Sequence, residues 1–315
     1  MEEMTRIERV RAAVSGHAVD RLPLCFWHHF RPAGSGARMA EATLRFFDQE
    51  FDLDIVKIMP DLPYPFPRRA ISEPEDWRLI EPVAPDQGMF GQRLVAIRML
   101  REALGAETPI ILTIYNPVAE VRRFAADAET FTRHLREHPA AVHHALGVIA
   151  ENLQRNIAAA IAAGADGVYY ALQGITTDGL GEVGYREFGR PYDFIALRGA
   201  ESAWLNVCHV HGDHDLLMDL AIDYPVQVLS WSDRLTGLSL REVRLKSDKC
   251  FMGGLHEFGA LAAGDERAVI AEAQDAVEQT GGRKFILANG CSVPDETPHA
   301  NLRRSRAALG DIRPR

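Results

Sequence analysis

Two histidines and one cysteine have the residue types and the spacing of a metal site. His209 and His211 lie two residues apart in the run WLNVCHVHGD, and Cys291 lies in the turn NGC near the C-terminus. Residues two apart at the end of an extended strand point to the same side, so both imidazoles can face one space. Zinc accepts two imidazoles and one thiolate and keeps its fourth position for water or substrate. We therefore predict an open zinc site at these residues.

Each of these residues also has a simpler interpretation. A pair of histidines at a strand end often forms hydrogen bonds only, and an isolated cysteine is commonly a small buried apolar residue. Iron, cobalt and nickel also accept two imidazoles, so the residue types favour zinc without excluding these metals. The position of all three residues directly after predicted strands is what favours a metal site.

Polar side chains also follow the other apolar segments of the chain. A carboxylate just after a buried strand, as at Asp61, usually has a specific partner, and a histidine such as His28 is suited to proton transfer. We predict catalytic roles for His28, Asp61, Tyr115 and Asp233. We predict substrate-binding roles for Trp27, His29, Arg31, Asn116, Gln173, Trp231 and His256. The remaining helical histidines are expected on a solvated outer surface: His134, His138, His143 and His144.

The elements that must position these residues are visible in the hydrophobic pattern. Short apolar runs rich in β-branched and aromatic residues recur along the chain, as expected of buried parallel strands. They begin at Leu22, Leu53, Pro109, Asp166, Trp204, Val226, Lys249 and Lys284. Most intervals between them carry apolar residues three and four apart, which predicts helices. These helices are expected within residues 39–51, 92–104, 140–165, 214–223 and 265–282.

The β–α alternation predicts a single (β/α)8 TIM barrel domain spanning residues 1–315. No GxGxxG motif follows the first strand, which argues against a dinucleotide-binding doubly wound sheet. In a barrel, catalytic residues follow the carboxyl ends of the strands, which is where the candidate residues lie. We expect a helix near residues 6–14 at the barrel floor, and the proline-rich residues 60–86 over the mouth as a lid or pocket wall.

Composition excludes several classes of protein. The chain has 35 Lys plus Arg against 44 Asp plus Glu, a formal charge of −9, which argues against a nucleic-acid-binding scaffold. No apolar run approaches the roughly 20 residues that a membrane span requires, and the first residues form a charged amphipathic segment rather than a signal core. We therefore expect a cytoplasmic protein that contacts no membrane. Four scattered cysteines are too few for a disulfide framework.

Several stretches together resemble the uroporphyrinogen decarboxylase superfamily. The likeness runs from about Arg6 to Ala308, nearly the whole chain. The stretches that carry it are RVRAAVSGHAVDRLPLCFW, AGADGVYYALQG, NVCHVHGD, VQVLSWSD, FMGGLHEFGAL and GGRKFILANGCSVPDETPHANLR. The resemblance implies an enzyme built on a (β/α)8 barrel, with Asp61 where the family's catalytic aspartate lies.

Departures from the family pattern place the chain within the superfamily. True uroporphyrinogen decarboxylases carry Arg-Gln-Ala-Gly-Arg after the first strand and Gly-His-Gly near the last, whereas this chain reads WHHFRPAG and NGC. The zinc-dependent, cobalamin-linked methyltransferases carry His-x-Cys after the fifth strand and a cysteine after the eighth. His209 and Cys291 match that pattern, and His211 replaces the family's cysteine. The chain therefore resembles the methyltransferase branch, with one thiolate fewer.

The resemblance implies a zinc-dependent methyltransferase or demethylase that moves a methyl group between a small substrate or thiol and a corrinoid. We expect no corrinoid domain in this chain, so the corrinoid would come as a free cofactor or on a separate protein. An imidazole in place of a thiolate makes the metal more Lewis acidic and a bound thiolate less nucleophilic. Two alternatives stay open: a metal-independent decarboxylase that uses Asp61, and a corrinoid- or tetrapyrrole-binding protein without turnover. A homodimer is compatible with the sequence.

Overall fold

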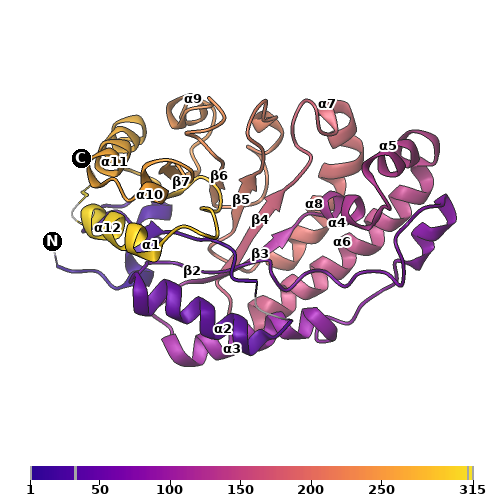
Figure 1. Ribbon diagram of the computed structural model, residues 1–315, viewed down its shortest axis with the longest axis horizontal. Coiled ribbons are helices and arrows are strands. Elements are labelled where there is room, and N and C mark those ends of the chain that lie inside the picture. Colours follow the sequence, from indigo (N-terminus) through magenta and orange to yellow (C-terminus); the bar gives the residue numbers. More distant parts are fainter. Residues whose placement is uncertain (1, 32–33, 311, 314–315) are drawn as a thin grey trace.

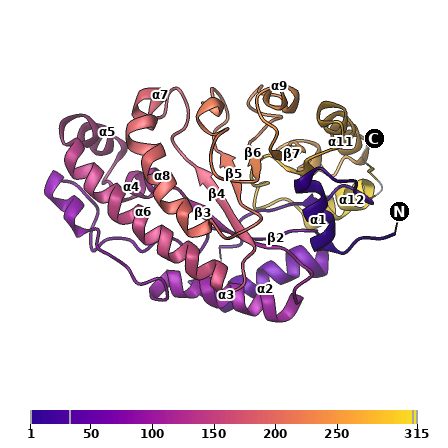
Figure 2. The same ribbon diagram turned by 180° about the vertical axis from the view of Figure 1, so that it is seen from behind.

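Parallel strands form a barrel that helices surround. The structure is a computed structural model, and it describes residues 2–31, 34–310 and 312–313. Figure 1 shows the strands at the centre and the helices around them, and Figure 2 shows the same arrangement from behind. The strands are β1 (Leu24–Cys25), β2 (Val56–Ile58), β3 (Ile110–Tyr115), β4 (Gly167–Leu172), β5 (Val207–Val210), β6 (Val228–Ser230), β7 (Cys250–Leu255) and β8 (Phe285–Asn289).

The strand order shows a nearly closed barrel. The 8-stranded sheet runs β1-β8-β7-β6-β5-β4-β3-β2, and every strand pair is parallel. Between β1 and β2, the Asp54 N–H donates to the Leu24 carbonyl at 2.9 Å, and the Leu24 N–H donates to Asp54 Oδ2 at 2.8 Å. These two bonds join the edges of the sheet. The predicted (β/α)8 single-domain fold is confirmed, and each predicted strand is present.

Most helices lie between successive strands, whereas α1 precedes β1 and α12 follows β8. The α-helices are α1 (Arg6–Ser15), α2 (Gly36–Leu44), α3 (Gly88–Leu104), α4 (Pro117–Phe124), α5 (Ala128–Glu137), α6 (Pro139–Ala162), α7 (Gly181–Gly184), α8 (Arg190–Leu197), α9 (Leu240–Arg244), α10 (Ala260–Ala263), α11 (Glu266–Thr280) and α12 (His299–Leu309). The described residues also form two π-helices, η1 (Arg45–Glu50) and η3 (Tyr185–Gly189), and three 3-10 helices, η2 (Pro74–Leu79), η4 (Arg198–Ala200) and η5 (Met218–Leu220). Four of the five helical patterns give helices at α2 with η1, α3, α6 and α11.

The prediction of a helix over residues 214–223 is wrong. Only the short η5 forms there, because the backbone bonds of the first half of the segment go to the loop after β4. The Leu217 N–H donates to the Ile175 carbonyl at 3.0 Å, and the Thr177 N–H donates to the Asp215 carbonyl at 3.1 Å. Pro225 then disfavours helical geometry at the residue before it.

The expectation that the outer histidines are all solvated also needs one correction. His134 on α5 is fully buried, and its Nδ1 accepts a hydrogen bond from the Trp77 indole N–H at 3.1 Å. Trp77 belongs to η2, so this contact fixes the segment after β2 on the outer helices. His138 and His144 are exposed, as expected.

Charged residues join α1 to the floor of the barrel. The buried Asp54, just before β2, accepts from Arg9 of α1 at 2.7 Å and from Arg21 at 2.6 Å. Burial of a carboxylate is costly unless it is paired, and here both oxygens also receive hydrogen bonds. The helix that the sequence places at residues 6–14 therefore lies at the amino ends of the strands.

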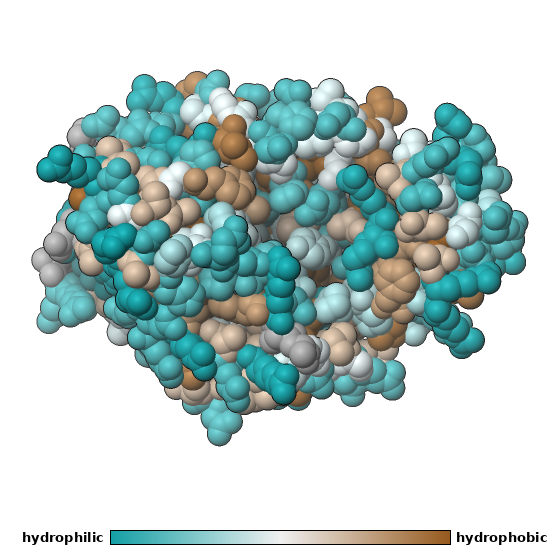
Figure 3. Space-filling model, viewed as in Figure 1, coloured by the Kyte–Doolittle hydropathy of each residue, from teal (hydrophilic) through white to brown (hydrophobic). Residues whose placement is uncertain are grey.

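The proline-rich segment after β2 covers the outer helices more than the mouth. Its first residue, Pro60, lines the cavity described below. Further along, η2 packs on α6, and the Val83 N–H donates to Asn152 of α6 at 2.9 Å. Within the described part of the chain, no helix combines the length and the apolar character that a membrane crossing needs. Figure 3 shows one face that is mainly hydrophilic, with hydrophobic residues in small separate patches.

Candidate metal centre

A small cavity lies among the carboxyl ends of the strands. Its volume is about 120 Å³. The residues around it come from several strand ends, as expected for the mouth of a (β/α)8 barrel. They are Trp27, His29, Lys57, Met59, Pro60, Thr113, Tyr115, Tyr169, Ala171, Gln173, His209, His211, Cys291 and Ser292.

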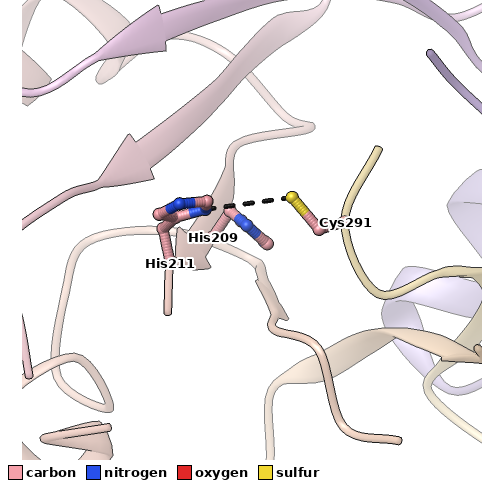
Figure 4. Close-up of side chains that lie close together, drawn as sticks. All are labelled: His209, His211 and Cys291. Atoms are coloured by element: carbon pink, nitrogen blue, oxygen red, sulfur yellow. Dashed lines mark hydrogen bonds between the residues drawn. The ribbon is translucent and has the colours of Figure 1, made fainter. Parts of the chain in front are cut away.

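Three of these residues converge as a potential ligand set. His209 lies on β5, His211 lies just after it, and Cys291 approaches from the segment after β8 (Figure 4). One ligand atom from each residue lies within 4.8 Å of the others. The Cys291 Sγ is 3.8 Å from His211 Nδ1. The two parts of the sequence that we predicted to form a metal site, 80 residues apart, therefore meet in space.

The three side chains fit a tetrahedral metal ion. With Zn–S near 2.3 Å and Zn–N near 2.0–2.1 Å, a tetrahedral ion holds a sulfur and a nitrogen roughly 3.5 Å apart, close to the separation seen here. His209 Nε2 is buried and has no hydrogen-bond partner among the described residues. Its other nitrogen, Nδ1, lies 3.3 Å from the Ser230 hydroxyl oxygen. A ligand histidine usually donates its second N–H to such an acceptor, which fixes the ring and its tautomer.

Burial sets the protonation of the three ligands. It lowers the pKa of His209 well below the usual histidine range, and the neighbouring His211 and Lys57 lower it further. It also lowers the pKa of His211, against a smaller opposite effect of Asp213. Both imidazoles are therefore neutral, as metal binding requires. Burial raises the pKa of the Cys291 thiol, so this group must release a proton when a metal binds.

Lys57 is a cavity residue that our sequence analysis did not identify. The amine is fully buried and lies 4.2 Å from the centre of the Tyr169 ring and 4.9 Å from that of Trp27. Its one hydrogen-bonding contact among the described residues is the Met59 sulfur, at 3.2 Å. Burial lowers the pKa of Lys57 to about 8, although Cys25, Cys291 and Asp61 act in the opposite direction. The signal for this residue was a lysine inside the apolar strand LDIVKIM.

Asp61 and His29 form a pair at the edge of the cavity. Asp61 Oδ1 lies 2.5 Å from His29 Nδ1. Asp61 Oδ2 accepts hydrogen bonds from the backbone N–H groups of Phe30 at 2.8 Å and Arg31 at 3.1 Å. Burial alone would raise the pKa of Asp61, but these hydrogen bonds outweigh it and the pKa is lowered. Asp61 is therefore an ionised carboxylate that holds the loop after β1, and His29 is the member of the pair that lines the cavity.

Of the other predicted residues, some line the cavity and some do not. Trp27, Tyr115 and Gln173 line it. Burial raises the pKa of Tyr115 to about 12, so this phenol stays protonated at neutral pH. Asn116 is not among the lining residues: it caps α4 by accepting from the Ala119 N–H, and its amide donates to the Gln173 carbonyl.

The predicted residues after β6 and β7 do not line the cavity either. The Trp231 indole N–H donates to the Leu238 carbonyl at 2.7 Å. Asp233 accepts from the Gly254 N–H at 2.8 Å, and burial raises the pKa of this carboxyl to about 6. His256 Nδ1 accepts from the Phe258 N–H at 3.2 Å. These side chains hold neighbouring segments of the barrel in place.

Two residues of the loop after β1 also lie away from the cavity lining. The buried His28 packs edge-on against Phe30 and Phe46, and its Nδ1 lies 2.7 Å from the His29 carbonyl oxygen. Arg31 is largely exposed and forms an ion pair with Asp295 at 2.6 Å. Of the polar residues just after β1, only His29 therefore lines the cavity.

Solved structures of other proteins share the fold of this chain. A methyltransferase from Methanosarcina mazei has a TM-score of 0.82 at 20% sequence identity, over 98% of this chain and 99% of that chain. A B12-independent methionine synthase from a Shewanella species, in complex with selenomethionine, has a TM-score of 0.61 at 13% identity, over 92% of this chain and 94% of that chain. At these identities the likeness concerns the fold. No curated protein matches the sequence.

The family is established by sequence. The family model for uroporphyrinogen decarboxylase matches residues 49–310, which is most of the chain. The chain therefore belongs to the uroporphyrinogen decarboxylase family, a family of enzymes. This confirms the resemblance that the sequence motifs indicated.

Proposed function

We propose that this protein is a zinc-dependent methyltransferase that moves a methyl group between a corrinoid and a small substrate, most simply a thiol. The observation that carries the proposal is the buried, unpartnered Nε2 of His209 beside His211 and Cys291 in a cavity at the barrel mouth. An orphaned buried nitrogen is costly unless it has a partner, and a metal ion supplies one. The similarity in fold to a methyltransferase also supports this function.

The residues around the cavity would have different roles in this reaction. His209, His211 and Cys291 would hold the metal, and zinc bound there supplies the Lewis acidity that lowers the pKa of a bound thiol. Ser230 keeps the His209 ring in one orientation through Nδ1. Trp27 and Tyr169 form apolar walls, which limit the water around the reacting sulfur.

The size of the cavity constrains the methyl donor. A cavity of about 120 Å³ accepts a compound of a few heavy atoms and is far too small for a corrin ring. A corrinoid would therefore meet the substrate at the mouth and present only its methyl group. This is compatible with a corrinoid supplied on a separate protein or as a free cofactor.

A methyl-transfer assay tests the proposal. The zinc-loaded protein is mixed with methylcobalamin and 2-mercaptoethanol, and S-methylated product is measured by mass spectrometry. We expect product with the parent protein and with His256→Ala, which alters a residue outside the cavity lining, and none with Cys291→Ala or His211→Ala. Equal product from all four proteins, or product that chelators do not reduce, would contradict a metal-dependent reaction.

The decarboxylase alternative is not favoured by the position of Asp61. Its carboxylate is engaged by His29 on one oxygen and by two backbone N–H groups on the other. These contacts favour its ionised form and occupy both oxygens. We therefore retain the methyltransferase as the single proposal.

A further inference from the structure

We propose that His29 is the base that takes the proton from the thiol as the thiol enters the cavity, and that Asp61 is the positioning residue that holds His29 for this step. This inference rests on the proposed function, because it assigns the proton that thiol activation must release. It gives roles to a pair that the metal site itself does not use.

The geometry of the pair fixes which nitrogen is basic. Asp61 Oδ1 lies 2.5 Å from His29 Nδ1, and its other oxygen is held by the Phe30 and Arg31 N–H groups. The Asp61 side chain is only 8% exposed, so this arrangement is largely shielded from competing water. An ionised carboxylate at Nδ1 keeps the proton on that nitrogen. The lone pair of His29 then lies on Nε2, and the ring lines the cavity.

The other titratable side chains around the cavity are poorer bases. Burial raises the pKa of Tyr115 to about 12, and it raises the pKa of Tyr169 well above the usual tyrosine range. Lys57 has a pKa of about 8 after burial and is protonated at neutral pH, with its ammonium over two aromatic rings. Apart from His209 and His211, His29 is the one imidazole among the described lining residues.

The proton transfer balances without any further reactant. The S–H bond of the thiol breaks, its electron pair stays on sulfur, and an N–H bond forms at His29 Nε2. The thiol becomes a thiolate, and His29 becomes an imidazolium whose positive charge is stabilised by Asp61. The thioether product cannot take the proton back, so His29 must pass it to water. The His29 side chain is 29% exposed, which gives this proton a route to solvent.

A second histidine–carboxylate pair provides a matched control. His299 Nδ1 lies 2.6 Å from Glu50 Oε2, a contact similar to that of His29 with Asp61. His299 is not among the residues that line the cavity. His299→Gln therefore removes an equivalent ring and ion pair without touching the proposed base.

Stopped-flow measurement of thiol binding tests the inference apart from catalysis. The zinc-loaded protein is mixed with 2-mercaptoethanol at pH 7.5 in dilute buffer with a pH-indicator dye, which follows the rate at which the thiol proton reaches solvent. In the parent protein and in His299→Gln, His29 takes this proton and passes it to water, so we expect fast release. In His29→Gln the thiol has no neighbouring base, so we expect release to be about 100-fold slower.

Activity measurements add a readout that a structural role would not move. We expect His29→Gln to lose about 100-fold in methyl transfer at pH 7 and to recover as the pH rises, because more of the thiol is then already ionised. Added imidazole should restore part of the activity of His29→Gly. It should not change the activity of His299→Gly. Asp61→Asn should keep zinc and lose activity, because the wrong tautomer of His29 becomes accessible.

The results distinguish this inference from the proposed function. Equal rates of proton release from the parent and His29→Gln, with thiol binding intact, would overturn the role of His29 and leave the methyltransferase standing. A lack of imidazole rescue in a folded, zinc-containing His29→Gly protein would also overturn it. Absence of thiol binding to the zinc-loaded parent would overturn both.

Discussion

Polar side chains follow β6 and β7 as well as β2, β5 and β8. The two regions differ in whether these side chains form hydrogen bonds to the rest of the protein. We call Trp231, Asp233 and His256 the β6–β7 group, and His209, His211 and Cys291 the metal group. In the β6–β7 group, the side chains bond to backbone atoms of nearby segments. In the metal group, His209 Nε2 has no hydrogen-bond partner in the described part of the chain, and the side chains face one another.

The difference teaches that position after a strand does not by itself make a binding site. In the metal group an unmet nitrogen lies beside two other ligand atoms, whereas the side chains of the β6–β7 group bond to the protein itself. A buried polar atom that the protein itself satisfies has little left to offer a ligand. Glu257, just after β7, shows both kinds of atom. The Ser232 hydroxyl donates to Glu257 Oε1 at 2.6 Å, whereas Glu257 Oε2 has no hydrogen-bond partner among the described residues and lies 3.9 Å from His256 Nδ1. Sequence reasoning missed this buried acid because it directly follows His256.

Removal of a metal ligand gives the largest expected effect. We expect His209→Ala and Cys291→Ala to lower bound zinc from about one equivalent to less than about a tenth, because a structural or catalytic zinc site needs all its protein ligands. His256→Ala should keep full zinc. Elemental analysis of the purified, untagged proteins measures this, and retention of zinc in both ligand variants would show that the metal group is not the site.

The second effect concerns the residue that orients His209. Ser230→Ala removes the oxygen near His209 Nδ1, and we expect about a 10-fold loss of zinc affinity, the lower end for such supporting contacts. Ser232→Ala, at the same strand end but bonded to Glu257, is the control and should bind zinc as the parent does. Competition with a chromophoric chelator gives the affinities. Equal losses in both variants would point to a general loosening of β6.

The third effect concerns the buried charge of Lys57. Because burial lowers its pKa to about 8, the charged form costs folding free energy below that pH, and the cost fades as the pH rises toward 10.5. Lys57→Met should therefore stabilise the metal-free protein by about 1–2 kcal/mol at pH 7, with a smaller gain at pH 9.5. Denaturant unfolding at both pH values measures this. A loss of stability at pH 7 would mean that the contacts with the aromatic rings outweigh the cost of burial.

The smallest effect tests the β6–β7 group. Burial raises the pKa of Asp233 to about 6, so the charged form costs stability above that pH and the cost is absent below the ordinary aspartate range near 3.8. Asp233→Asn keeps an oxygen for the Gly254 N–H and should stabilise the protein by about 1 kcal/mol at pH 7.5, with less gain at pH 5. Urea unfolding measures the difference. A gain that does not depend on pH would contradict this cause.

The fold could be predicted almost completely from the sequence, because each buried parallel strand is a short apolar run bounded by polar residues. The failures have local causes. The pattern at residues 214–223 is helical, yet its backbone bonds to the loop after β4 instead. His134 lies in an amphipathic helix, yet a neighbouring segment supplies Trp77 to cover it. Neither partner is visible from the local sequence.

The candidate site could be predicted only in part. The rule that catalytic residues follow the carboxyl ends of barrel strands correctly selects the mouth of the barrel. The structure places Trp27, His29, Tyr115 and Gln173 around the cavity together with the metal group. The rule does not tell which loops turn inward, so Asn116 and the β6–β7 group were selected by the same rule. Lys57 was missed because the rule considers residues after a strand, whereas this lysine lies within β2.

X-ray absorption at the zinc edge tests the central claim most directly. For the zinc-loaded parent protein, the account predicts one sulfur at about 2.3 Å and two imidazole nitrogens at about 2.0–2.1 Å, with a light atom in the fourth position. The small amount of zinc that Cys291→Ala retains should show no sulfur shell, and His256→Ala should leave the spectrum unchanged. A parent spectrum without sulfur, or one that keeps sulfur in Cys291→Ala, would contradict a metal centre formed by His209, His211 and Cys291.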